Sequence, residues 1–194
     1  MRRVRTAVLI SGTGSNMEAL IRASQKPDYP ADIQLVISNR PKAKGLDKAR
    51  ALGVAAFCID HKAYDSREDF DAALRASLDE HGIELVALAG FMRILTPGFV
   101  EAWSGRMINI HPSLLPKHKG LNTHARALEA GDKRHGATVH WVSPELDSGQ
   151  IIAQAAFDIP KDATPDTLAA RVRPLEHKLY PQALREAALT LCDN

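Results

Sequence analysis

The sequence predicts a single three-layer α/β/α domain, residues 1–194, with a mostly parallel mixed sheet of about seven strands. Apolar segments of strand length alternate with segments of helical periodicity, which is typical of βαβ units. The length of 194 residues suits one hydrophobic core. The composition, 45% apolar and 25% charged, is that of an ordinary folded protein, so neither long disorder nor a coiled coil is expected.

The first half of the chain contains three strand and helix pairs in succession. Strands are expected in "VRTAVLIS", "IQLVIS" and "AAFCI", and helices from about Asn16, through "GLDKARAL" and from Ser66. Ser66 and Asp69 have the spacing of a capping box, and Gly82 ends the apolar pattern of the third helix. Parallel strands are predicted here, because a crossover helix joins each strand to the next.

The second half continues with the strand "ELVALAG", a short helix from Pro97, the strand "MINIH" and a helix around "THARALEA". Two further strands, "GATVHWV" and "GQIIAQAAF", are separated only by "SPELDS", which favours an antiparallel hairpin and a mixed sheet. The last helix begins around Thr164 to Asp166. Pro174 and Pro181 lie inside it and are expected to kink or divide it.

Charge and cysteine content disfavour several classes of protein. The formal charge is +2 and the basic residues are scattered, so no nucleic-acid partner is expected. No apolar stretch approaches the length of a membrane span, and "MRRVR" precedes too short an apolar segment for a signal peptide. Cys58 and Cys192 lack CxxC spacing, so neither a disulfide framework nor a structural zinc site is predicted. A reducing cytoplasm is the expected location.

The loop "SGTGSN" joins the first strand directly to the first helix. Glycines let backbone N–H groups approach an anion, and a helix N-terminus favours negative charge, so the loop is a candidate phosphate site. A tight turn capped by Ser15 or Asn16 explains the same residues equally well. The full GxGxxG pattern and a Walker lysine are missing, and no acidic residue for a ribose follows the second strand, which disfavours a nicotinamide cofactor.

Asn109 and His111 give the strand "MINIH" one polar face. Residues two apart in a strand share a face, so these side chains point together and away from Ile108 and Ile110. They fall at the carboxyl end of the strand, where open α/β sheets bind ligands. An amide N–H beside an imidazole can stabilise an oxyanion when a carbonyl is attacked, although a lone histidine is more often structural or exposed.

Asp147, in "ELDSGQ", is either a turn residue or a carboxylate that approaches His111 and favours its imidazolium form. Sequence spacing leaves both interpretations open. No HExxH-like spacing links the remaining histidines, which include His118, His124, His135 and His140. This histidine spacing disfavours a metal site. Ser113 is not part of a GxSxG elbow, which disfavours a serine hydrolase.

Five motifs appear in order at the spacing of one known family: "SGTGSN", "LAGFMRIL", "NIHPSLLP", "HGATVHWV" and "ELDSGQII". From about Val4 to Pro181 the chain resembles the phosphoribosylglycinamide formyltransferases, folate-dependent enzymes of purine (IMP) synthesis. The resemblance implies a Rossmann-like formyltransferase fold and formyl transfer from 10-formyltetrahydrofolate to the amine of 5-phosphoribosylglycinamide, without a metal. It also implies a nucleotide-phosphate half, about 1–100, and a catalytic and folate half, about 101–194.

The resemblance assigns roles to individual residues. Asn109, His111 and Asp147 match the family's catalytic trio. The expected substrate-binding residues are Gly14, Ser15, Asn16 and Glu176. The expected folate-binding residues are Arg67, Met92, Arg93, Ile94, Leu95, Asn109, Ser143, Pro144, Glu145, Leu146 and Asp147. Without the resemblance, Met92, Ile94 and Leu95 would be interpreted as core residues and Arg67 as an exposed residue at a helix start.

Three other functions are weighed against this one. A formyltetrahydrofolate deformylase uses the same trio but lets water attack; it normally carries an additional N-terminal domain, whereas the first strand here begins by Val4. A methionyl-tRNA formyltransferase needs a C-terminal RNA-binding domain, for which we expect no room. A non-catalytic folate- or phosphate-binding module would use Asn109 and His111 only to line a pocket. The expected partners are the two small-molecule substrates, and the expected assembly is a monomer or a homodimer.

Overall fold

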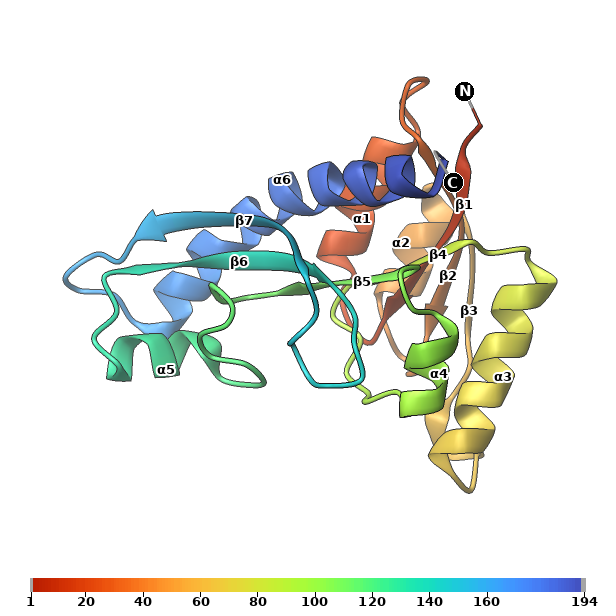
Figure 1. The fold of residues 1–194 in the computed structure, drawn as a ribbon, viewed down its shortest axis with the longest axis horizontal. Helices are drawn as coiled ribbons and strands as arrows, with labels where there is room; N and C mark the ends of the chain where they lie inside the picture. The colour runs from red at the N-terminus through yellow and green to blue at the C-terminus, as the bar shows by residue number, and fades with distance from the viewer. Residues whose placement is uncertain (1, 193–194) are drawn as a thin grey trace.

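Seven strands form one sheet in the order β3-β2-β1-β4-β5-β6-β7 in the computed structural model, which describes residues 2–192 (Figure 1). The strands are β1 (Val4–Ile10), β2 (Ala31–Ser38), β3 (Ala55–Cys58), β4 (Leu85–Leu88), β5 (Met107–His111), β6 (Arg134–Trp141) and β7 (Ile151–Asp158). The first five strands pair in parallel, whereas β6 runs antiparallel to both β5 and β7. The predicted mixed sheet and its antiparallel hairpin are therefore confirmed.

The chain changes direction across the sheet between β1 and β4. From β1 it moves outward through β2 and β3, and it then returns to place β4 on the other side of β1. The carboxyl ends of β1, β4 and β5 consequently lie side by side. Loops that diverge at such a switch point leave a crevice, which is where open α/β sheets bind ligands.

Helices cover both faces of the sheet (Figure 1). They are α1 (Ser15–Ser24), α2 (Gly45–Ala51), α3 (Arg67–Glu80), α4 (Pro97–Ala102), α5 (Thr123–Glu129) and α6 (Pro165–Cys192), with a 3-10 turn η1 (His61–Ala63). Residues of α1, α2 and α6 pack into one buried apolar cluster, and residues of α3 and α4 pack into a second. The sheet thus separates two hydrophobic cores, as a three-layer α/β/α fold requires.

The predicted start of α3 is confirmed in detail. The Ser66 hydroxyl oxygen accepts a hydrogen bond from the Asp69 N–H at 3.0 Å, which satisfies a donor that the first turn leaves free. Phe70, Leu74 and Leu78 are buried on the side that faces the sheet. Alternation of apolar and polar residues at helical spacing was therefore enough to orient this helix.

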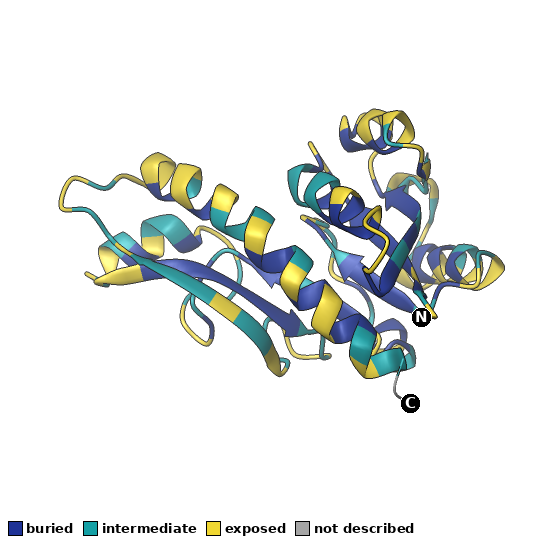
Figure 2. Ribbon diagram, turned by 90° about the horizontal axis from the view of Figure 1, so that it is seen from above, coloured by how far each residue is buried: buried dark blue, intermediate teal, exposed yellow. Residues whose placement is uncertain are grey.

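The long helix α6 is continuous for 28 residues, so the expected division at Pro174 or Pro181 does not occur. A proline removes the hydrogen bond to the carbonyl four residues earlier. For Pro174 that carbonyl belongs to Ala170, which is exposed, so water can replace the lost bond. The buried side of α6 faces β6 and β7 (Figure 2), and the Tyr180 hydroxyl donates to the Leu88 carbonyl at 2.9 Å. This packing keeps the helix continuous across Pro174 and Pro181.

Despite the length of α6, none of the helices within residues 2–192 combines the length and apolar character that crossing a membrane requires.

Candidate active site

The polar face of β5 lies as the alternation predicts. Ile108 and Ile110 are buried in the apolar cluster on the α6 side of the sheet. Asn109 and His111 point to the opposite side, where Asn109 is half-buried and His111 is 6% exposed. The strand therefore presents two polar side chains together at its carboxyl end, next to the crevice between β1 and β4.

Acceptor groups lie beside both ring nitrogens of His111. Nε2 is 2.9 Å from the carbonyl oxygen of His118, and Nδ1 is 3.5 Å from Oδ2 of Asp147. A carbonyl oxygen can only accept, so Nε2 carries a proton. The nitrogen that can gain or lose a proton during a reaction is therefore Nδ1, and the carboxylate beside it stabilises the imidazolium form.

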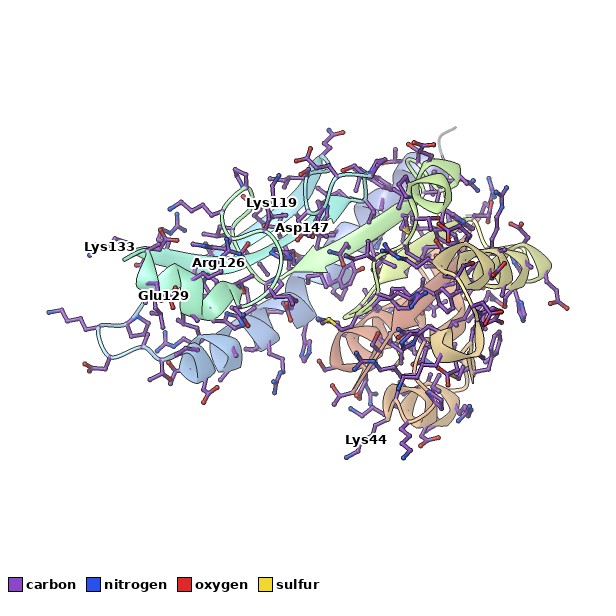
Figure 3. The ribbon with its side chains drawn as sticks, turned by 90° about the horizontal axis from the view of Figure 1, so that it is seen from below. Lys44, Lys119, Arg126, Glu129, Lys133 and Asp147 are labelled. Carbon is purple, nitrogen blue, oxygen red and sulfur yellow. The ribbon has the colours of Figure 1, made fainter. Side chains whose placement is uncertain are left out.

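Asp147 lies in the loop between β6 and β7 and reaches back to β5. Its backbone is left-handed, with φ of 48°, and its side chain is only 8% exposed. Oδ2 accepts a hydrogen bond from the Gly120 N–H at 2.8 Å, and Figure 3 shows Asp147 beside the loop that carries Lys119. The Lys119 ammonium donates to the Ser148 hydroxyl, at 2.5 Å. Two loops from different parts of the chain thus hold the carboxylate at the imidazole.

His140 belongs to the same cluster, and sequence reasoning missed it. It stands directly opposite Asn109 in the β5 and β6 pairing, and its Nε2 lies 3.2 Å from Asn109 Nδ2 and 3.7 Å from Oδ1 of Asp147. The only hint in the sequence is its place in the alternation of "GATVHWV". Strand register is needed to see which residue it faces.

The glycine loop opens a cavity of about 250 Å³ at the carboxyl end of β1. Its lining comprises residues 11–16, Arg40, Ala89, Gly90 and Met92. Gly14 has φ of 70°, and a Cβ atom added there would lie 2.9 Å from the Gly45 Cα, so this backbone requires glycine. The cavity reaches from the start of α1 to the loop after β4, with the Arg40 cation, which sequence reasoning also missed, at its side.

Asn16 and Glu176 meet although they are far apart in the sequence. Asn16 Nδ2 donates to Glu176 Oε2 at 3.1 Å, while Asn16 Oδ1 is buried without a hydrogen-bond partner among the described residues. Burial raises the pKa of Glu176, against the opposing effects of the Asn16 hydrogen bond and the Arg173 charge. The proline at 174 therefore does not keep Glu176 from the glycine loop.

The residues expected at the folate differ in exposure. Met92 and Ile94 are 59% and 64% exposed, whereas Leu95 is buried in the core cluster beneath α3 and α4. The Arg93 guanidinium lies 4.7 Å from the centre of the Phe70 ring, and its buried Nε has no hydrogen-bond partner within residues 2–192. For Leu95 the core interpretation holds, so only its backbone is available to a ligand.

Two further groups complete the expected folate site. Arg67 is exposed at the first position of α3, one turn before Phe70. In the loop 143–147, Ser143 is half-buried, Pro144 and Glu145 are exposed, and the Leu146 side chain is 56% exposed. Leu146 on this loop and Met92 and Ile94 after β4 are exposed apolar side chains, of the kind that line ligand sites.

No group of three or more His, Cys, Asp or Glu side chains in the described part of the chain could hold a metal ion.

Comparisons with known proteins agree with this geometry. A family model described as Formyl transferase matches residues 4–184. The phosphoribosylglycinamide formyltransferase of Escherichia coli (strain K12) is 47% identical over 174 residues, which cover 90% of this chain and 82% of that protein. The crystal structure of phosphoribosylglycinamide formyltransferase from Brucella melitensis has a TM-score of 0.92 at 49% identity, with 96% of both chains covered.

A longer relative contains a similar segment. The trifunctional purine biosynthetic protein adenosine-3 of Homo sapiens is 49% identical over 187 residues, which cover 96% of this chain but only 18% of that protein. The chain thus spans less than a fifth of the length of such relatives. The family model covers all seven strands of this sheet and both loops around Asp147, and we conclude that the chain belongs to the formyl transferase family.

Proposed function

We propose that this chain transfers a formyl group from 10-formyltetrahydrofolate to the amine of 5-phosphoribosylglycinamide, a step of purine (IMP) biosynthesis. The observation that carries the proposal is the meeting of Asn109, His111 and Asp147 at the carboxyl end of β5, beside a cavity lined by the glycine loop. The family match and the relatives of that name, over most of their length, support the same reaction.

In this reaction Asn109 and His111 act as hydrogen-bond donors. 10-Formyltetrahydrofolate supplies the formyl group, and the substrate amine attacks its carbon, so that negative charge develops on the formyl oxygen. The Asn109 amide and the protonated Nδ1 of His111 hold that oxygen. Loss of one such donor typically costs about 2.7–4 kcal/mol of transition-state stabilisation.

Proton transfer completes the exchange. The attacking amine becomes an amide and loses a proton, and the folate nitrogen, whose bond to the formyl carbon breaks, gains one. His111 Nδ1, or a water beside it, carries this proton, and Asp147 stabilises the ring while it is charged. The new carbon–nitrogen bond replaces the old one directly, so no covalent enzyme intermediate is needed.

The nucleotide end of the substrate binds in the first half of the chain, about 1–100. Backbone N–H groups of Gly14, Ser15 and Asn16, at the start of α1, hold the phosphate. Glu176 contacts the sugar or the glycinamide, and the buried, unpartnered Asn16 Oδ1 is open to a donor from the same ligand. Arg40, which lines this cavity, adds positive charge.

The folate binds between the loop after β4 and the second half of the chain, about 101–194. Backbone groups of residues 92–95 and 143–147 hydrogen-bond the pterin edge, and Met92, Ile94 and Leu146 pack on its faces. The unpartnered Arg93 Nε is a donor for the same ligand, and Arg67 meets the glutamate carboxylate of the folate tail. The residues present therefore fit the co-substrate.

Both free cysteines, Cys58 and Cys192, suit a reducing compartment, and we place the protein in the cytoplasm as a monomer or a homodimer. We propose small molecules as its only substrates, with neither nucleic acid nor a membrane as a partner.

Folate consumption with and without the amine substrate tests the proposal. Purified protein is given 10-formyltetrahydrofolate alone or together with phosphoribosylglycinamide, and deformylation of the folate is followed. We expect consumption only when the amine is present. Consumption without it would indicate a deformylase, and no consumption in either case would indicate a binding module.

A further inference from the structure

His140 is buried at the centre of the site, yet no step above uses it. Its side chain is 2% exposed, and the pairing between β6 and β7 shifts register between Val139 and His140. Such bulges re-aim a side chain, and they are common beside active sites. Here the extra residue of the bulge is Ile152 on β7, and His140, at this irregularity on β6, faces Asn109 across the β5 and β6 pair.

The hydrogen bonds of His140 determine its tautomer. Nδ1 lies 2.9 Å from the carbonyl oxygen of Trp141, which can only accept, so Nδ1 carries a proton. In a neutral ring Nε2 is then an acceptor. Asn109 Nδ2, at 3.2 Å, donates to it. The tautomer is opposite to that of His111, whose proton is on Nε2.

This bond fixes which way the Asn109 amide points. If the amide were turned over, its Oδ1 would face the lone pair of Nε2, and two acceptors would oppose each other. The ring therefore holds the NH₂ group in place and leaves its second N–H free for another acceptor. An amide without this partner could present its oxygen to a developing oxyanion, which would be repulsive.

The charged groups around His140 are few. Asp147 Oδ1 is 3.7 Å from Nε2, and His111 lies on the strand opposite. Burial lowers the pKa of His140 and the charge of His111 lowers it further, while the Trp141 carbonyl and Asp147 act in the other direction. The ring is therefore neutral near pH 7, as acceptance of a hydrogen bond from Asn109 requires.

We propose that His140 is a positioning residue for formyl transfer: its neutral imidazole, protonated on Nδ1, holds the Asn109 carboxamide with its NH₂ group toward the formyl oxygen. His140 itself does not touch the reacting atoms. The inference rests on the proposed function, since it explains how the Asn109 donor is kept in place for that reaction.

Kinetics of three variants test this role. His140→Leu removes the acceptor, and kcat should fall about 100-fold, as a small misplacement of a catalytic group can produce, with little change in either KM. His140→Gln offers an amide oxygen near the position of Nε2, so it should recover most of that loss. His135→Gln changes another buried histidine of β6 outside the site, and it should keep the wild-type kcat.

Nitrogen-15 NMR of histidine-labelled protein tests the tautomer without any substrate. We expect His140 to be neutral at pH 7 with its proton on Nδ1, and Asn109→Ala to shift the Nε2 resonance. A proton on Nε2, or a wild-type kcat in His140→Leu, would overturn the inference. Wild-type protein with the expected tautomer but without formyl transfer would instead contradict the proposed function and, with it, this role in catalysis.

Discussion

Asn109 and His111 lie on one face of β5, and both are proposed to hold the formyl oxygen. Substitution of either should therefore affect the reaction more than substrate binding. In Asn109→Ala or His111→Ala the formyl oxygen loses a donor, and kcat should fall by about 10²–10³. Substrate affinity should change little, because the proposed binding surface comes mostly from the glycine loop and the loop after β4. Kinetics and calorimetric titration measure the two effects separately. Equal losses in turnover and in affinity would contradict the catalytic assignment.

Glu176 is the residue at which the proposed substrate contact and the stability of the fold make opposite demands. Its folded-state pKa is raised, because burial disfavours the charged carboxylate. As the pH rises above about 4, the unfolded chain ionises first, and the free energy of unfolding falls until the folded-state pKa is passed. Glu176→Gln removes this loss. The variant should therefore unfold at a higher temperature than wild type near pH 7, and at a similar temperature below about pH 4.

A control variant and a second measurement separate the stabilisation expected in Glu176→Gln from the effect of simply removing a negative charge. Glu129→Gln changes an exposed carboxylate on α5, labelled in Figure 3, and should leave the pH dependence of unfolding unchanged. Glu176→Gln should also raise the KM for phosphoribosylglycinamide, because the acceptor for the sugar or amine is weakened. A variant that is less stable than wild type at pH 7 would contradict the assigned cost of burying the carboxylate.

At the scale of elements, a pair of histidines joins α5 to the sheet. His124 Nδ1 lies 2.8 Å from His135 Nε2, and the His135 side chain on β6 is 1% exposed. Burial, with the charges of His124 and His118 acting in the same direction and Asp132 opposing them, lowers the pKa of His135 to about 4. One neutral ring donates to the other, so protonation of both would break the contact.

Acid should therefore weaken the fold through His135. The His135 imidazole takes up a proton near pH 6.5 in the unfolded chain and only near pH 4 in the folded chain. The stability that neutral His135 contributes is therefore fully present above about pH 6.5 and is lost as the pH falls toward 4. The loss attributable to this group is on the order of 3 kcal/mol. Urea unfolding from pH 7 to pH 4 measures it. His135→Leu should flatten the profile, and an unchanged slope in that variant would contradict the assignment.

The loop that carries Asp147 depends on a close backbone approach at Gly149. A Cβ atom added there would lie 1.7 Å from the carbonyl oxygen of Trp141, so Gly149→Ala must displace the loop. Asp147 would move away from His111, and kcat should fall about 100-fold. Gly98→Ala is the matched control: its Cβ would meet no heavy atom of residues 2–192 within 4 Å, and it should stabilise α4 by about 0.5–1 kcal/mol at wild-type kcat.

At the scale of the whole molecule, sequence patterns predict the strands and helices because each pattern is local. Alternation in "MINIH" correctly puts Asn109 and His111 on one face, since a strand has a fixed period of two. The same patterns cannot show that His140 faces Asn109, because strand register depends on tertiary pairing. The continuity of α6 through Pro174 also escapes prediction, since packing against β6 and β7 outweighs the local preference of proline.

The Ser11 side chain connects the glycine-loop end of the site to the loop after β4. Its hydroxyl donates to Oδ1 of Asn39 at 2.5 Å and accepts the Met92 N–H at 2.7 Å, so it ties the ends of β1 and β2 to the loop after β4. Ser11→Ala leaves the buried Asn39 Oδ1 without its donor and the Met92 N–H without this acceptor, which should lower the free energy of unfolding by about 1–3 kcal/mol.

The loosened loops should also bind the substrates less well, because one forms the proposed phosphate site and the other the proposed folate site. The KM for both substrates should therefore rise in Ser11→Ala, while kcat falls less. Ser24→Ala is the control, since it removes a buried hydroxyl that donates to the Ile21 carbonyl within α1, away from the site. That variant should lose stability without a change in either KM. A rise in only one KM in Ser11→Ala would show that the two loops are held independently.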